Sequence, residues 1–329
     1  MKKLTKKYSV QLAGLLLLLA LLPVSCIKDD YAAKEKATVQ VTFTTRAISG
    51  SSDTDAEALE MYEHMKTLRV IVARASDNDI LYNVKYDIAE NETSKTITFS
   101  ELTIEKGGEL FDFYAIANES GVGYTSDWAT ITVEQLENIS LTEDALAKLN
   151  LGKTYIPQTA HAQINVGEAT GDVTIPLQFA VAKVRLTIEN TSTDQQTVND
   201  ISLSGVNTTS TKLFGATPVT ATDTGKALSL GNMVFSAETN GTPGKNTVYA
   251  YFFENQNSEG YTLTAFWKKD QTLPLQTGSD DNKQPITEIP RGKMLDITIK
   301  LNADVDIEPT INVQVDEWTG KTINVPSFQ

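Results

Sequence analysis

Apolar and polar residues alternate along short segments over most of this chain. In Val39-Gln40-Val41-Thr42-Phe43, three apolar side chains fall on one face, which is typical of a half-buried strand. Turn-forming residues separate such segments at intervals of roughly 8–12 residues, as in β-sandwiches and barrels. The sequence therefore predicts a mainly antiparallel β fold. The other predicted strands are Leu68–Val72, Ile80–Val84, Thr96–Phe99, Leu110–Ala117, Val181–Ile188, Ile201–Leu203, Val248–Phe253, Tyr261–Trp267, Met294–Leu301, Ile311–Val315 and Thr322–Val325.

Helical patterns are few and short. Residues Ala56–Leu68 have apolar side chains roughly on one face, which predicts one helix. Two further short helices are predicted within Thr132–Asn150, because Thr132 with Gln135 and Ser140 with Glu143 have the spacing of capping boxes.

The first 26 residues have the pattern of an export signal. Met1–Lys7 carries four lysines, and an uncharged apolar run follows from Ala13 to Leu22. That run is too short to span a membrane, which takes about 20 apolar residues. It ends in Pro23-Val24-Ser25-Cys26, which resembles a bacterial lipobox, although Pro23 stands where an aliphatic residue is usual. We expect Cys26, the only cysteine, to carry acyl chains; the alternative is ordinary cleavage nearby that leaves a free thiol.

Length and charge limit the remaining possibilities. Without residues 1–25 the 329-residue chain is long enough for about two domains of roughly 150 residues. We expect their boundary near Gly171–Pro176, after a loop-like stretch at Gln158–Ala162. The formal net charge of −14 argues against nucleic acid as a partner, because phosphate binding needs concentrated Lys and Arg.

The sequence holds no strong signature of catalysis, a cofactor or a metal. His64 and His161 have no Ser or Cys motif nearby, and we expect them to be ordinary surface or loop residues. Asp77-Asn78-Asp79 and Ser279-Asp280-Asp281-Asn282 lack the twelve-residue calcium loop and are better explained as turns. Trp128, Trp267 and Trp318 are more often core residues than a sugar platform. We expect no enzyme activity. A hydrolase stays open as an alternative, because two carboxylates far apart in the sequence can meet in the folded chain.

Several segments together resemble the fimbrillins of Bacteroidetes, the major fimbrial subunits also called type V pilins. They are the lipobox at Cys26, the strand that ends at Arg46, and the tail that contains Trp318. Leu177–Val184, Tyr251–Asn255 and Ile289–Lys293 also look like segments of that family. One departure is Gln178-Phe179, where the family more often has an arginine before the Ala-Lys pair.

This resemblance implies two transthyretin-like β-sandwich domains and a mechanism of assembly. Residues 1–25 would be the lipoprotein signal, 26–46 an acylated propeptide, 47–175 the N-terminal domain, and 176–329 the C-terminal domain with its tail. An arginine-specific protease would cut the outer-membrane lipoprotein at Arg46-Ala47. The strand with Val39, Val41 and Phe43 would then leave its groove, and the C-terminal strand of another subunit would replace it. The donor side chains would be Ile311, Val313, Val315, Trp318, Ile323 and Val325.

A subunit of this kind would have other copies, or related fimbrial subunits, as its partners. Within that hypothesis, a stalk subunit is favoured over an anchor because Arg46 supplies a cleavage site, and over a tip because no added lectin-sized domain is visible. Two other hypotheses stay open. The first is a lipid-anchored glycan-binding or adhesive surface protein, which predicts an exposed Trp or Tyr cluster. The second is a surface hydrolase, which predicts two convergent carboxylates in a cleft.

Overall fold

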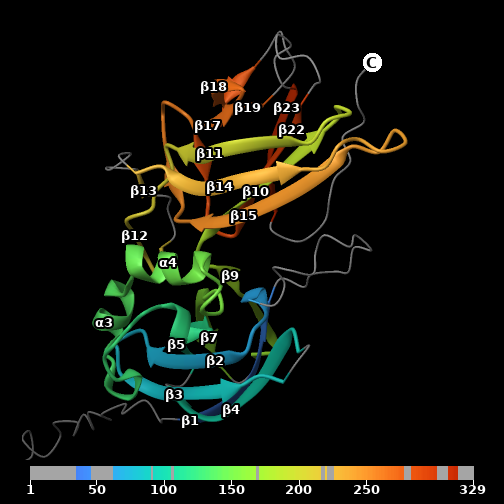
Figure 1. The fold of residues 1–329 in the computed structure, drawn as a ribbon. Coiled ribbons are helices and arrows are strands. Elements are labelled where there is room, and N and C mark those ends of the chain that lie inside the picture. Colours follow the sequence, from blue (N-terminus) through green and yellow to red (C-terminus); the bar gives the residue numbers. More distant parts are fainter. Residues whose placement is uncertain are drawn as a thin grey trace, which may run out of the picture.

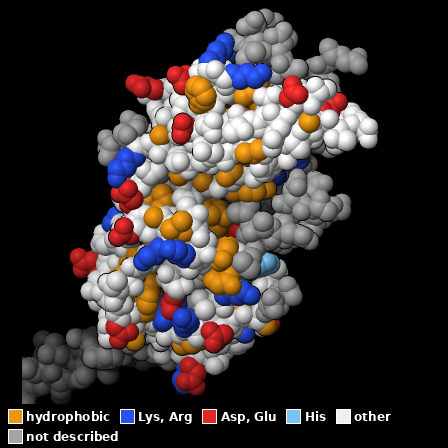
Figure 2. Space-filling view, viewed as in Figure 1, with side chains coloured by type: hydrophobic (Ala, Val, Ile, Leu, Met, Phe, Trp, Pro, Cys, Tyr) orange, Lys and Arg blue, Asp and Glu red, His pale blue; other side chains and the backbone are white. Residues whose placement is uncertain are grey.

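The computed structural model describes residues 35–45, 62–89, 92–104, 107–167, 170–215, 219–220, 226–277, 283–301 and 310–317. Strands dominate, and the predicted mainly β fold class is confirmed. Two groups of sheets lie one above the other, with the helices α3 and α4 on one side near the middle (Figure 1). Hydrophobic side chains gather across the middle of the visible face, whereas charged ones are scattered (Figure 2). In the described part of the chain, no helix is long and apolar enough to cross a membrane.

The first group of strands forms two sheets that enclose one apolar core. One sheet has the strand order β4-β1-β8 and the other has β3-β2-β5-β7-β9. Val41 from the first sheet and Phe113 from the second both belong to this core, so the two sheets pack face to face. The strand bounds are β1 (Glu35–Thr44), β2 (Thr67–Arg74), β3 (Ile80–Asp87), β4 (Ser94–Ile104), β5 (Glu109–Ala117), β7 (Gln158–Val166), β8 (Val173–Pro176) and β9 (Gln178–Phe179).

Short helices cover the other face of the five-stranded sheet. Tyr114 of that sheet and Leu136 and Leu146 of the helices belong to one buried cluster. The elements here are the 3-10 helices η1 (Glu119–Gly121) and η2 (Trp128–Thr130), α3 (Val133–Asn138), the short strand β6 (Ser140–Thr142) and α4 (Glu143–Asn150). The two helices predicted within Thr132–Asn150 are confirmed.

The helix predictions were wrong in two details. The Thr132–Gln135 capping box is present, but Ser140 lies in β6, and α4 begins after Thr142 without a side-chain cap. Pairing of β6 with β12 (Ser210–Lys212) overrides the local signal. The helix predicted over Ala56–Leu68 does not reach its expected end, because β2 begins at Thr67 and pairs with β3 and β5. Its residues 56–61 lie outside the described residues.

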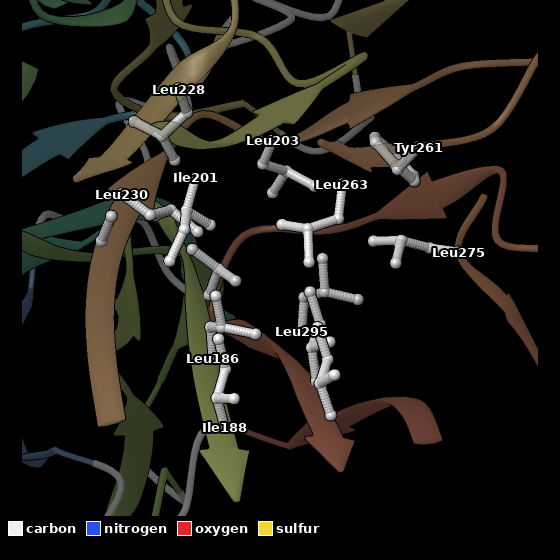
Figure 3. Close-up of a cluster of buried hydrophobic side chains, with 14 of the residues drawn as sticks. Leu186, Ile188, Ile201, Leu203, Leu228, Leu230, Tyr261, Leu263, Leu275 and Leu295 are labelled. Carbon is white, nitrogen blue, oxygen red and sulfur yellow. The ribbon is translucent and has the colours of Figure 1, made fainter. Parts of the chain in front are cut away.

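The second group of strands also forms two principal sheets around a core. Their orders are β15-β10-β22-β23 and β14-β11-β17-β18. Figure 3 shows Leu186 and Leu295 of the first sheet pointing toward Leu203 and Leu263 of the second. The bounds are β10 (Ala182–Asn190), β11 (Gln196–Ser204), β13 (Val219–Thr220), β14 (Leu228–Phe235), β15 (Gly244–Phe252), β16 (Asn255–Gln256), β17 (Thr262–Trp267), β18 (Lys269–Pro274), β19 (Gln276–Thr277), β20 (Gln284–Pro285), β21 (Glu288–Ile289), β22 (Lys293–Leu301) and β23 (Thr310–Glu317).

One segment was predicted wrongly as a loop. Gln158–Ala162 is the first part of β7, which pairs with β5 over nine residues. Its two alanines have low intrinsic strand preference, but long-range pairing outweighs such local preferences. The predicted division at Gly171–Pro176 stays a prediction. The chain passes between the two groups of sheets a few residues later, because β8 pairs with β1 and β9 with β7, whereas β10 pairs with β15 and β22.

Candidate functional site

The strand β1 is deeply buried on one face. Val39 is 1% exposed, and Val41 and Phe43 have no exposed surface. The alternating polar residues, such as Gln40, remain exposed or partly exposed. The inward face predicted for Val39, Val41 and Phe43 is therefore present, and it fills the centre of the first core.

Strands on both sides hold β1 in place. It runs antiparallel to β4, with Val41 opposite Ile97, and parallel to β8, with Phe43 opposite Ile175. The last pair on the β8 side is Thr44 with Pro176, and the Thr45 amide donates to the Thr93 carbonyl at 2.8 Å. β1 thus fills a slot between two strands, and its end lies next to the predicted cleavage site. Arg46 and Ala47 themselves, like Cys26, lie outside the described residues.

The C-terminal strand β23 is held less firmly. It lies at one edge of its sheet and, within the part of the chain that the structure describes, pairs with β22 alone, with Val313 opposite Ile297. Ile311, Val313 and Val315 contact the second core but are only partly buried. The predicted alternation is therefore present, with the strand folded back on its own sheet. Trp318, Ile323 and Val325 lie outside the described residues.

Two segments that carried the family resemblance meet at a buried ion pair. The Arg291 guanidinium bonds to the Glu254 carboxylate, and both side chains are almost fully buried. Arg291 also donates to the carbonyls of Leu213 and Lys212 at 2.8 and 2.7 Å, and Thr211 donates to Glu254 at 2.7 Å. The pair therefore ties the segment after β15 and the turn before β22 to the chain around β12.

A second buried ion pair joins the two groups of sheets. Lys183 Nζ of β10 lies 2.5 Å from Glu63 Oε1, and their side chains are 7% and 4% exposed. Tyr251 donates to the same carboxylate oxygen at 3.4 Å. Burial raises the pKa of Tyr251, and the nearby Glu63 charge raises it further, so this phenol stays protonated and donates. Sequence reasoning missed these partners, although a lysine inside the apolar run Ala180–Val184 indicates a buried counter-charge.

The residues considered for other chemistry have structural partners. His161 stacks on Tyr114 at 4.3 Å, and its Nε2 lies 2.8 Å from Asp112 Oδ1. The backbone carbonyl of His64 accepts a hydrogen bond from Asn118. The Asp77 carboxylate accepts the Asp79 amide at 3.0 Å and pairs with Arg74, as expected of a turn rather than a calcium site.

Metal ligands do not gather in the described part of the chain. Within it, no group of three or more His, Cys, Asp or Glu side chains is placed to hold a metal ion. The turn predicted at Ser279–Asn282 lies outside the described residues.

The tryptophans divide between core and surface. Trp267 is 2% exposed and belongs to the second core, as expected. Trp128 is only partly buried, and its ring lies 4.6 Å from that of Tyr124. Arg69 lies over the same indole at 5.6 Å and bonds to Glu119. This small aromatic cluster reaches the surface beside the edge strand β3.

Solved structures with the same arrangement of sheets are fimbrial and cell adhesion proteins. The tip fimbrial protein Mfa3 from Porphyromonas gingivalis, with a C-terminal truncation, matches with a TM-score of 0.56 and 11% identity, over 86% of this chain and 100% of its own. A putative cell adhesion protein from Parabacteroides distasonis matches with a TM-score of 0.52 and 15% identity, over 90% and 99%. One from Bacteroides eggerthii matches with a TM-score of 0.50 and 14% identity, over 86% and 96%.

The chain has the fold of these fimbrial and adhesion proteins. This fold agrees with the resemblance to Bacteroidetes fimbrillins. No protein-family model matches the sequence, and no curated protein matches it. At identities of 11–15%, the similarity concerns the fold, and function has to be argued from the strands themselves.

Proposed function

We propose that this chain is a structural subunit of a cell-surface fimbria that polymerises by strand exchange. The observation that carries the proposal is the position of β1: a central strand whose apolar face is buried and which ends at Thr44, two residues before Arg46. The lipobox at Cys26 supports export to the outer membrane as a lipoprotein, and the fold shared with a fimbrial protein supports the assembly.

Cleavage at Arg46-Ala47 would leave β1 held only by noncovalent contacts. Val39, Val41 and Phe43 contribute about 1.5–3 kcal/mol each, or roughly 5–9 kcal/mol together, in addition to the ladder hydrogen bonds. Loss of β1 would expose an apolar slot and unpaired backbone groups of both β4 and β8, a costly state that favours insertion of another strand.

The strand β23 has the chemistry to fill that slot. Ile311, Val313 and Val315 repeat the spacing of Val39, Val41 and Phe43. These three side chains are only partly buried at an edge. When β23 leaves its own sheet, they therefore lose roughly half of the free energy that full burial would give, about 2–5 kcal/mol. Full burial in the slot of another copy regains more than this, before the cost of association is counted.

A subunit with both a slot and a donor strand supports a stalk role. Each copy accepts one strand and donates one, and such a head-to-tail contact propagates as a filament. Its partners would be other copies or related fimbrial subunits, the arginine-specific protease and, before cleavage, the outer membrane through the lipid on Cys26. The role would be structural and would involve no catalysis.

The test is assembly after limited digestion with an arginine-specific protease. Protein that begins at Ile27 is cut, its new N-terminus is identified by mass spectrometry, and filaments are sought by electron microscopy. We expect Arg46→Ala to stay uncut and monomeric. Val313→Asp should be cut but not assemble, whereas Asn312→Asp, on the exposed side of β23, should assemble. Cut protein that stays monomeric, or assembly of Val313→Asp, would contradict the proposal.

A glycan-binding or adhesive role remains the second candidate, because Trp128 and Tyr124 form an aromatic pair at the surface. Aromatic rings that pack on the protein with one face and expose the other to solvent can stack on the apolar face of a sugar ring. Trp128→Ala should then abolish binding to a glycan array while the circular dichroism spectrum keeps its β-sheet signal, although some stability is lost because Trp128 also packs against the helix-covered core. Equal glycan binding by both proteins would eliminate this role for the pair.

A further inference from the structure

A groove runs along the outer edge of β8. The sheet β4-β1-β8 has three strands and faces a sheet of five, and among the described residues no strand pairs with β8 on the side away from β1. The groove has a volume of about 390 Å³. Its lining comes from β7 and β8, from Gln178 of β9, and from Phe214, Gly215 and Arg291. The first sandwich is therefore open where a fourth strand of the smaller sheet would lie.

The floor of this groove is incompletely covered apolar surface. Ala160 and Ala162 of β7 and Val173 of β8 line the groove and pack against the first core but remain only partly buried. In contrast, Val41 and Phe43 in the middle of the smaller sheet have no exposed surface. A strand placed beside β8 would cover the side chains of β7 and pair with the free edge, which is the geometry of strand addition.

We propose that this groove binds residues Thr322–Val325 of a neighbouring copy as a fourth strand beside β8. The inference rests on the proposed function, in which β23 of that neighbour occupies the slot of β1. Since β1 and β8 are adjacent, the chain that follows β23 emerges one strand away from β8, whichever direction the inserted strand runs.

The length of the connection fits. The path from the slot to the far side of β8 is two strand spacings, about 10 Å. Residues Trp318–Lys321 separate β23 from the predicted strand, and four extended residues reach about 13 Å. Gly320 within this connection permits the turn that the path requires.

The predicted strand also matches the groove in length and pattern. It has four residues, as does β8, and Pro326 ends it. Ile323 and Val325 lie on one face and would point at the small side chains Ala160 and Ala162, where there is room for them. Thr322 and Asn324 would face solvent, as Thr174 does in β8.

Disulfide trapping between copies tests this placement. Protein that begins at Ile27 contains no cysteine, so any disulfide that forms must join the introduced cysteines. Adjacent strand residues have Cβ atoms about 4.5–5.5 Å apart, close enough for a disulfide with small adjustment. We would combine Thr174→Cys with Asn324→Cys, and Thr174→Cys with Thr322→Cys to allow for the register. The control combines Thr98→Cys, exposed on β4 at the opposite edge of the same sheet, with Asn324→Cys.

After cleavage, assembly and mild oxidation, we expect one of the Thr174 pairs to give a ladder of disulfide-linked subunits on a non-reducing gel. The Thr98 pair should give at least about tenfold less product. If the cysteine-free parent assembles but neither Thr174 pair links, or if both edges link equally, the groove takes another ligand and this inference is overturned. If the parent does not assemble at all, the proposed function fails as well, and the two failures are thereby distinguished.

Discussion

Replacing Phe43 by alanine should destabilise the precursor and leave the assembled fimbria unchanged. The Phe43 ring has no exposed surface and lies between Lys95 of β4 and Ile175 of β8 along the ladder. Truncation of a fully buried phenylalanine costs about 3–5 kcal/mol. With a urea dependence of roughly 2–3 kcal/mol per M for a chain of this size, the unfolding midpoint should fall by about 1–2.5 M.

The same substitution should have no effect once strand exchange has occurred. In the proposed mechanism, cleavage at Arg46 would put Phe43 in the released piece, and the donor strand would then fill its position. Phe111 provides the matched control, because it also has no exposed surface and belongs to the same core, but it lies in β5, which stays in the subunit. Phe111→Ala should weaken both forms by a similar amount.

The assay compares urea unfolding of uncut monomers, followed by circular dichroism, with urea dissociation of assembled filaments, followed by light scattering. Phe43→Leu, a milder change, serves if the alanine variant does not fold. The reasoning is refuted if Phe43→Ala weakens assembled filaments as much as Phe111→Ala does, because β1 would then still occupy its slot.

Three further predictions concern residues outside the slot. Arg291→Met should lower the free energy of unfolding by about 3–5 kcal/mol, because it leaves the buried Glu254 carboxylate without its cation, and adding Glu254→Leu should recover most of the loss. Burial alone would raise the pKa of Glu119, but hydrogen bonds and charges from two basic side chains outweigh it and lower the pKa. Stability from Glu119 is therefore full above its unfolded value of 4.5 and is lost as the pH falls through the lower folded value, so the deficit of Glu119→Gln in urea unfolding should disappear in acid. Thr132→Ala should cost about 1 kcal/mol in thermal unfolding through loss of its cap. Ser140→Ala, which removes no cap, should stay within about 0.5 kcal/mol.

Local alternation predicted the strands well where the two faces differ in polarity. Val39–Phe43 and Ile80–Val84 both lie in strands, and the turn at Ser76–Asp79 joins β2 to β3. The turn could be found because its chemistry is local: Asn78 adopts a positive φ of 61°, and Asp77 bonds two residues ahead. The first segment of β7 was missed, because Ala160, His161 and Ala162 gain their strand conformation from pairing with β5 rather than from their own preferences.

The sequence identified most residues of the candidate site, but it did not show which other residues they contact. The inward faces of β1 and β23 could be predicted because apolar residues recur at every second position, and every second side chain of a strand points to the same face of the sheet. The neighbours of β1, by contrast, come from positions at least 50 residues away for β4 and more than 130 residues away for β8, and no local pattern specifies them. The pairing of Lys183 with Glu63 is of the same kind, with 120 residues between the partners.

The sequence by itself determined which side chains of this protein seek burial and where its strands turn, and it predicts an export signal, because these depend on residues adjacent in the chain. Only the tertiary structure decided that β1 is a central strand, that β23 lies at an edge with its apolar side chains partly covered, and that β8 borders an open groove. Burial of one strand depends on which others cover it, and that is a property of the assembled sheets. The difference in burial between β1 and β23 is what makes an exchange of one for the other energetically reasonable.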